Sequence, residues 1–376
     1  MTQDRSEDRA VLDDLDQEDS LEEESQEAIP ELEPLSYFGT DFDVHGLVRR
    51  LNAGDIIVPS FDPVVSDIAD VAGFQRKFVW KKMQMDRFIE SLLLGFPIPG
   101  IFLVQQADKS LLVLDGQQRL TTLQRFYAGQ LDRDREFVLE NVADDYKSLT
   151  YATLDDEQRR TIDNTFIHAT VVKYNPSMGG AESVYSLFER LNTGGTNLYP
   201  QEIRVALYNG RLVELLRELN SDQNWRAIYG AVNERLKDQE LILRFLAFHE
   251  DEESYERPLK AFLNTFLDAH RDLQGLDSDR LKSIFLRTCQ IANEVMGRSA
   301  IRPENQINAA FADAILIGLA RRLATGDVED KPSLVTARNT LLADNNFVSA
   351  IARATADEDR VSRRLSLARE AFQAVK

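Results

Sequence analysis

One short polar stretch, residues 115–119, combines side chains that could bind a phosphate. It reads Asp-Gly-Gln-Gln-Arg and lies between the apolar run 111–114 and a segment with helical spacing of apolar residues. A strand, a tight turn and a helix start can present backbone N–H groups to an anion, because the first turn of a helix has unpaired donors. We call this stretch the polar turn, and it predicts an anion site.

Each residue of the polar turn could take a part in phosphate chemistry. Gly116 would let a ligand approach the backbone closely, and Arg119 could contact two phosphate oxygens at once. Gln117 and Gln118 could orient a water molecule or contact a sugar or base. Asp115 could polarise the attacking water or hold Mg²⁺, which prefers oxygen ligands. The candidate catalytic residues are therefore Asp115, Gln117, Gln118 and Arg119, and the candidate metal ligand is Asp115.

A purely structural reading of the polar turn is also open. Asp115 could cap the following helix by accepting from its backbone N–H groups, and Arg119 could pair with a nearby acid. Spacing alone does not separate this reading from the phosphate site.

An upstream cluster could supply charge to the same anion. Gln75 and Arg76 come shortly before Trp80, with lysines at 77, 81 and 82. Arg76 would add positive charge. Trp80 could stack on a base, but a tryptophan at a helix start more often anchors a core, and we predict the core role.

A downstream cluster could close over the ligand. Asn192 is followed by Thr-Gly-Gly at the end of the predicted helix 181–191, an arrangement typical of a helix that ends in a glycine loop. An ordinary helix cap and turn would look the same. The candidate nucleotide-binding residues across the three clusters are Gln75, Arg76, Gly116, Arg119, Thr121, Asn192, Gly194 and Gly195.

Hydrophobic periodicity predicts the elements that position these clusters. Helices are expected at 43–53, 81–94, 118–129 and 181–191, and strands at 55–58, 100–105, 111–114, 135–140 and 166–174. Beyond Pro200 the sequence predicts seven or eight amphipathic helices and no strand. The fold class is therefore α+β, with a mixed first domain at 37–209 and a helical second domain at 210–376.

Charge and composition exclude several classes of protein. The formal net charge is −19, and residues 1–34 alone hold 14 acids and two arginines, which predicts a disordered acidic tail over 1–36. The body is not basic, as a non-specific DNA-binding protein would be. The single cysteine, Cys289, excludes an intrachain disulfide and a cysteine zinc site. Without an apolar run of membrane length or a signal-like start, we expect a cytoplasmic protein with no membrane partner.

The three clusters together resemble one family. The strings Phe-Gln-Arg-x-Phe-Val-Trp, Phe-Ile-Glu-Ser-Leu-Leu-Leu-Gly-Phe-Pro-Ile-Pro, Asp-Gly-Gln-Gln-Arg-Leu-Thr-Thr-Leu and Phe-Glu-Arg-Leu-Asn-Thr-Gly-Gly are similar to those of the N-terminal domain of GmrSD-type restriction enzymes. The similarity covers roughly residues 43–210. It implies a ParB/sulfiredoxin-like domain, nucleotide binding with NTP hydrolysis centred on Asp115 to Arg119, and a role in bacterial defence against phage.

Two departures limit what the resemblance implies. Such enzymes often carry a His-Asn-His nuclease domain, but the helical half has only His249 and His270, without that motif. We therefore expect no nuclease activity in this chain and a separately encoded nuclease as a partner. The insertion between Pro59 and Phe74 is longer than the usual step and could reshape access to the site.

The sequence thus supports a nucleotide-dependent switch or NTPase that uses an NTP of unspecified base and Mg²⁺. DNA, a separate nuclease and a second copy of the chain are possible partners. Two alternatives stay open: a non-catalytic interaction module with a vestigial nucleotide pocket, and direct recognition of DNA.

Overall fold

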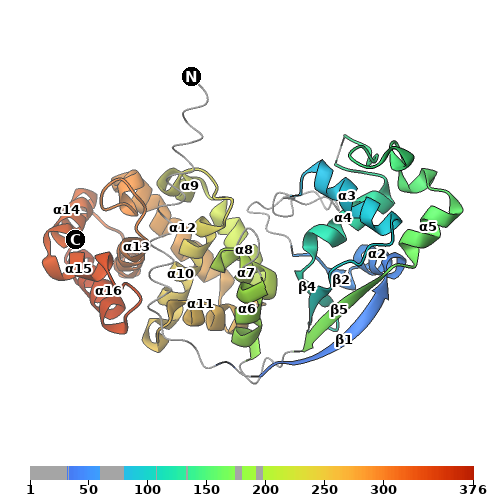
Figure 1. Cartoon of the computed structure of the whole chain (residues 1–376). Coiled ribbons are helices and arrows are strands. Elements are labelled where there is room, and N and C mark those ends of the chain that lie inside the picture. The colour runs from blue at the N-terminus through green and yellow to red at the C-terminus, as the bar shows by residue number, and fades with distance from the viewer. Residues whose placement is uncertain are drawn as a thin grey trace. The chain divides into compact units, whose positions relative to one another are not determined.

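The chain forms two compact units, which we describe separately. A computed structural model describes residues 32, 34–59, 80–106, 108–132, 134–173, 180–191 and 198–376. The α+β unit holds the described residues up to Leu207, and the helical unit runs from Tyr208 to Lys376 (Figure 1). The predicted α+β class with a helical C-terminal region is confirmed. Among the described helices, none combines the length and apolar character needed to cross a membrane.

A five-stranded mixed sheet organises the α+β unit. Its strand order is β1-β5-β3-β4-β2, with β1 antiparallel to β5, β3 parallel to β5 and antiparallel to β4, and β2 parallel to β4. The strands are β1 (Ser36–Asp43), β2 (Ile56–Ile57), β3 (Ile101–Gln105), β4 (Leu111–Asp115) and β5 (Phe166–Lys173). The end of β4 therefore lies beside the start of β3, where the chain turns into the next helix.

Two strand predictions were incomplete or wrong. β1 was missed because most of its residues are exposed, so it lacks the apolar alternation that marks a half-buried strand. Instead of the strand expected at 135–140, the structure has a single isolated bridge between Gln130 and Glu136. The apolar residues Phe137 and Leu139 are fully buried in the core from an irregular segment, so their alternation reflects burial rather than pairing.

Helices cover the sheet of the α+β unit. Alternate strand residues such as Ile101, Val113 and Ala169 join the apolar stripes of the first helices in one core. Trp80 packs against this core and lies edge-on to Phe88, which confirms its predicted role. The helices are α2 (Val44–Ala53), α3 (Lys82–Leu93), α4 (Gln117–Ala128), α5 (Asp156–Asp163), α6 (Gly180–Leu191) and α7 (Pro200–Leu207).

The helical unit contains more and shorter helices than expected. Ten α-helices follow one another from Pro200 to the end, against the seven or eight predicted, because elements such as the seven-residue α9 are too short to show a clear period. Those of the helical unit are α8 (Arg211–Asn220), α9 (Gln223–Tyr229), α10 (Lys237–Asp251), α11 (Leu259–Ala269), α12 (Ser278–Val295), α13 (Ala309–Leu323), α14 (Lys331–Ala343), α15 (Asn345–Ala352) and α16 (Glu358–Gln373).

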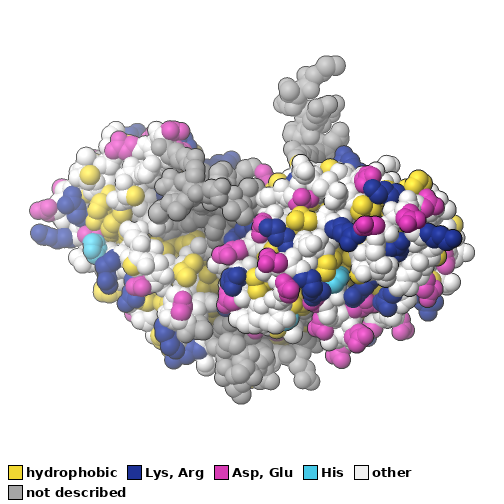
Figure 2. Space-filling view, turned by 180° about the vertical axis from the view of Figure 1, so that it is seen from behind, with side chains coloured by type: hydrophobic (Ala, Val, Ile, Leu, Met, Phe, Trp, Pro, Cys, Tyr) yellow, Lys and Arg dark blue, Asp and Glu magenta, His cyan; other side chains and the backbone are white. Residues whose placement is uncertain are grey.

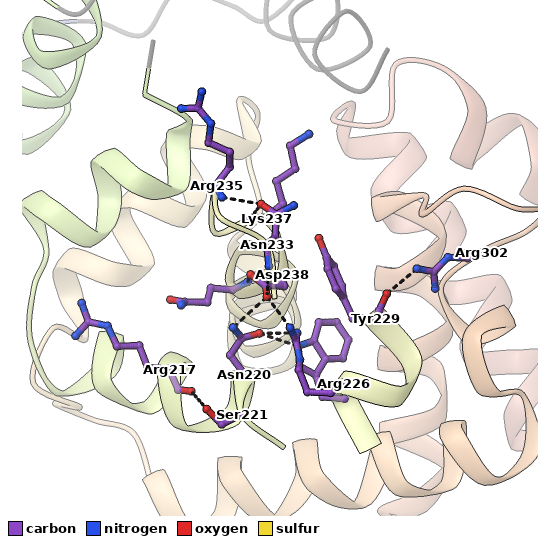
Figure 3. A network of polar contacts seen from close by, with 12 residues as sticks. Arg217, Asn220, Ser221, Arg226, Tyr229, Asn233, Arg235, Lys237, Asp238 and Arg302 are labelled. Carbon is purple, nitrogen blue, oxygen red and sulfur yellow. Dashed lines mark hydrogen bonds and ion pairs between the residues drawn. The ribbon is translucent and has the colours of Figure 1, made fainter. Parts of the chain in front are cut away.

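A buried polar network joins the first helices of this unit (Figure 3). The Asp238 carboxylate is fully buried and accepts from Asn220 Nδ2 at 3.1 Å, from Arg226 Nη1 at 2.8 Å and from Asn233 N at 3.1 Å. Asn220 Oδ1 in turn accepts from Trp225 Nε1 at 3.0 Å and from Arg226 Nη2 at 2.8 Å. We call these residues the Asp238 network. It ties α8, α9 and α10 together.

Candidate functional site

The polar turn connects β4 to α4 through a glycine that no other residue could replace without strain. Gly116 is the N-cap of α4 and has a φ of +96°, in the left-handed region. A Cβ added there would lie 2.5 Å from Ile101 Cγ2 on the neighbouring strand. The glycine is therefore required by the backbone and by packing, whether or not a ligand binds.

The mostly buried Arg119 side chain stabilises the polar turn through hydrogen bonds. Its Nη2 donates to Asp115 Oδ2 at 3.0 Å, and its Nη1 donates to the carbonyl oxygens of Pro99 and Gly100, the latter at 3.1 Å. The Arg119 side chain is 13% exposed and that of Asp115 47%. Burial lowers the pKa of the Arg119 guanidinium, and the Asp115 charge opposes that shift. Arg119 thus fixes the turn to the loop that precedes β3.

The N-terminus of α4 is open. Its N-cap residue, Gly116, has no side chain that could cap it, and its first turn contains no acidic residue. The first intrahelical bond runs from Leu120 N to Gly116 O at 3.0 Å, so the backbone donors of residues 117–119 precede it. The structural reading of the turn is therefore half right: Arg119 does pair with an acid, but Asp115 does not cap the helix.

The two glutamines of the polar turn differ in their contacts. Gln118 Oε1 accepts from the backbone N–H of Trp80 at 3.3 Å, which ties the start of α3 to the start of α4. The half-buried Gln117 side chain makes no hydrogen bond with the described residues. Gln118 is therefore a structural link, whereas the Gln117 amide has no hydrogen-bond partner among the described residues.

The remaining predicted site residues divide into two groups. Thr121 lies on α4 and is buried, with 3% of the residue exposed. Gln75, Arg76, Asn192, Gly194 and Gly195 lie outside the described residues. Their placement relative to the polar turn stays a prediction.

Asp115 could share an ion with a phosphate but could not hold one alone. Its Oδ2 is engaged by Arg119, and its partial exposure leaves the other oxygen accessible. Among the described residues, no group of three or more His, Cys, Asp or Glu side chains could hold a metal. Mg²⁺ is commonly bound by one or two carboxylates together with phosphate oxygens and water, and a single carboxylate at this position fits that pattern.

Comparison with known proteins identifies part of the chain. Residues 62–209 match the family model for the GmrSD restriction endonuclease N-terminal domain. The family resemblance predicted from the motifs is thereby confirmed for this GmrSD segment, which contains the polar turn, α3 and α4. The family indicates a restriction-type phage defence system. No curated protein and no solved structure matches the chain.

Sequence reasoning missed two sets of contacts in the α+β unit. The carbonyls of Pro99 and Gly100 bind Arg119, and the only signal for them was the Pro-Ile-Pro-Gly string that positions a loop before β3. On β5, His168 Nδ1 lies 2.9 Å from Asp41 Oδ1 on β1. These two residues are 127 positions apart, so only the pairing of β1 with β5 brings them together.

Proposed function

We propose that the α+β unit binds a nucleoside triphosphate with its phosphates at the N-terminus of α4, and that it hydrolyses the nucleotide within a restriction-type phage defence system. The open start of α4 carries this proposal. Backbone donors and the helix dipole favour an anion there, and neither the N-cap residue Gly116 nor an acid of the first turn competes with it. The GmrSD segment supplies the biological setting.

The contacts of the polar turn suggest a separate role for each of its residues in nucleotide binding. Arg119 would hold the turn in shape and contribute positive charge, rather than act as a free phosphate clamp. Gln118 would keep the start of α3 in place, and Gln117 would contact the phosphates or the attacking water. Asp115 would hold Mg²⁺, which when bound supplies charge neutralisation for the phosphate oxygens.

We further propose that the chain acts together with a separately encoded nuclease. The described part of the chain has no cluster of histidines and acids that could bind a catalytic metal. DNA is a weaker candidate ligand. Figure 2 shows acidic and basic side chains interspersed over the face in view, without a broad basic area of the kind that neutralises DNA phosphates.

The experiment is a titration of all four NTPs into the full chain by calorimetry, with and without Mg²⁺, followed by phosphate-release assays with and without DNA. We expect at least one NTP to bind and Arg119→Ala to weaken it by tenfold or more. A chain that neither binds nor hydrolyses any NTP under these conditions would overturn the proposal.

A second candidate function is a non-catalytic interaction module with a vestigial pocket. The observation that favours it is that Gly116 and Arg119 have sufficient structural reasons to be present, since one avoids Ile101 and the other braces the loop. It predicts that Arg119→Lys, which keeps the charge but not the paired contacts, changes stability and leaves phage defence intact.

A further inference from the structure

An exposed aromatic and polar cluster lies on β5 and β1, two strands away from the polar turn. Phe166 and His168 are two residues apart on β5 and therefore lie on the same face of the sheet. Phe166 is 67% exposed and the His168 side chain 58% exposed. Opposite His168, the Asp41 carboxylate accepts a hydrogen bond from Nδ1, and this contact fixes the orientation of the imidazole ring. We call Phe166, His168 and Asp41 the β5 platform.

Two glycines keep the surroundings of His168 flat. On β1, a Cβ added to Gly39 would lie 2.9 Å from His168 Cε1, so the imidazole ring rests directly over this glycine. Just before β3, a Cβ added to Gly100 would lie 3.1 Å from the His168 backbone oxygen and 3.7 Å from His168 Cβ. No side chain therefore rises beside the ring at either position, and a planar ligand could lie against it.

Gly100 also connects the platform to the polar turn. Its carbonyl oxygen accepts from Arg119 Nη1 at 3.1 Å, while an added Cβ would meet the backbone oxygen and the Cβ of His168. One residue thus separates the Arg119 guanidinium from the β5 platform. The phosphates and the base of a nucleotide are separated by a ribose, which could cross this short stretch of bare backbone.

From this arrangement we infer that the β5 platform receives the nucleobase of the nucleotide whose phosphates lie at the N-terminus of α4. The inference rests on the proposed function. Phe166 and His168 would stack on the base, and the Asp41 carboxylate would accept a hydrogen bond from an amino or imino N–H of its edge.

The charges around the platform favour a single nucleotide over a nucleic-acid strand. On β1, Asp41 lies opposite His168 and Asp43 lies opposite Phe166, so both charges beside the platform on that strand are negative. On the other side, Gly100 just before β3 and Phe102 on β3 carry no charge. On β5 itself the basic residue is Lys173, which lies over Phe38 at the far end of the strand. A strand of DNA or RNA would need cations along its backbone on this face.

The test compares binding of ATP, GTP, CTP and UTP with binding of inorganic tripolyphosphate, which lacks a base. We expect Phe166→Ala and His168→Ala each to weaken the preferred NTP about tenfold, the usual size of a stacking contribution, and to leave tripolyphosphate affinity unchanged. Asp41→Asn should alter the order of preference among the four bases. Phe38→Ala is the matched control, because Phe38 lies on β1 but alternates to the opposite face, where its partner Val171 is in the core.

The outcomes separate the two proposals. If the unmodified chain binds neither NTP nor tripolyphosphate, the proposed function fails and the platform fails with it. If the chain binds NTPs but Phe166→Ala and His168→Ala do not change their affinity, the base lies elsewhere and only the platform is overturned. Equal losses for NTP and tripolyphosphate would also overturn the platform. Because Asp41 and His168 form an exposed pair of little energetic value, these variants should fold normally.

Discussion

The polar turn and the Asp238 network both contain an arginine–aspartate pair, but the aspartate is partly exposed in the first and completely buried in the second. Each joins an arginine to an aspartate next to the start of a helix. In the network, Asp238 is completely buried and the carboxylate accepts from a side-chain amide, a guanidinium and a backbone N–H. In the polar turn, Asp115 is half exposed and the helix end beside it has no cap.

This difference separates a structural site from a candidate binding site. A buried arginine–aspartate pair whose partners are supplied from within the protein organises the fold and offers nothing to a ligand. Five helices of the helical unit have side-chain caps, from Asp222, Asp277, Asn308, Asp330 and Asp344. The helices α8, α10, α11 and α16 have none, so the missing cap alone does not distinguish α4. At the start of α4, Arg119 holds the turn in place, Gly116 supplies no side-chain cap and the first turn has no acid, a combination that favours an anion at the backbone N–H groups.

The largest expected effect on stability comes from disrupting the Asp238 network. Asp238→Ala would leave the Arg226 guanidinium and the Asn220 amide without their shared acceptor, and removing one partner of a buried pair costs about 3–5 kcal/mol. Denaturant unfolding of the full chain measures this loss. Asp238→Asn keeps one acceptor oxygen and should cost less. Loss of nucleotide binding by a still-folded Asp238→Ala protein would contradict the purely structural role of the network.

A smaller loss of stability should follow from Gly116→Ala in the polar turn. A left-handed backbone and a Cβ that meets Ile101 together cost roughly 3 kcal/mol. Gly129→Ala is the matched control, because Gly129 at the other end of α4 has a φ of +68° but no atom within 4 Å of an added Cβ. It should lose only the backbone part, about 1 kcal/mol. Equal losses for the two variants would show that Ile101 does not set the requirement.

From the sequence, the local elements of the polar turn could be predicted better than its contacts with the rest of the unit. Its strand, glycine and helix start are encoded by adjacent residues, so local pattern was enough to place them. The contacts that decide its character are not local: Arg119 reaches back to Pro99 and Gly100, and Gln118 reaches Trp80. No spacing rule gives such contacts. For the same reason the Asp238 network and the pairing of His168 with Asp41 could not be predicted.

The smallest effect concerns pH and the helical unit. Burial lowers the pKa of His249 below its ordinary value near 6.5, and the hydrogen bond that the Glu250 carboxylate accepts from its Nδ1 opposes that shift. The unfolded chain then binds the proton of His249 more readily than the folded chain does. The free energy of unfolding is therefore not reduced by this residue above pH 6.5, and it declines as the pH falls below that value. His249→Gln should flatten this decline in unfolding experiments between pH 7 and pH 5.

The central claim, that the open start of α4 binds phosphate, is tested most directly by Gln117→Glu. An acid in the first turn complements the helix dipole and should raise stability by a few tenths of a kcal/mol to about 1 kcal/mol, while it repels a phosphate at the same place. Gln158→Glu makes the same change in the capped first turn of α5 and should not affect binding. We predict that calorimetric NTP affinity falls at least tenfold in Gln117→Glu while its unfolding free energy is unchanged or higher. NTP affinity equal to that of the unmodified chain would contradict the account.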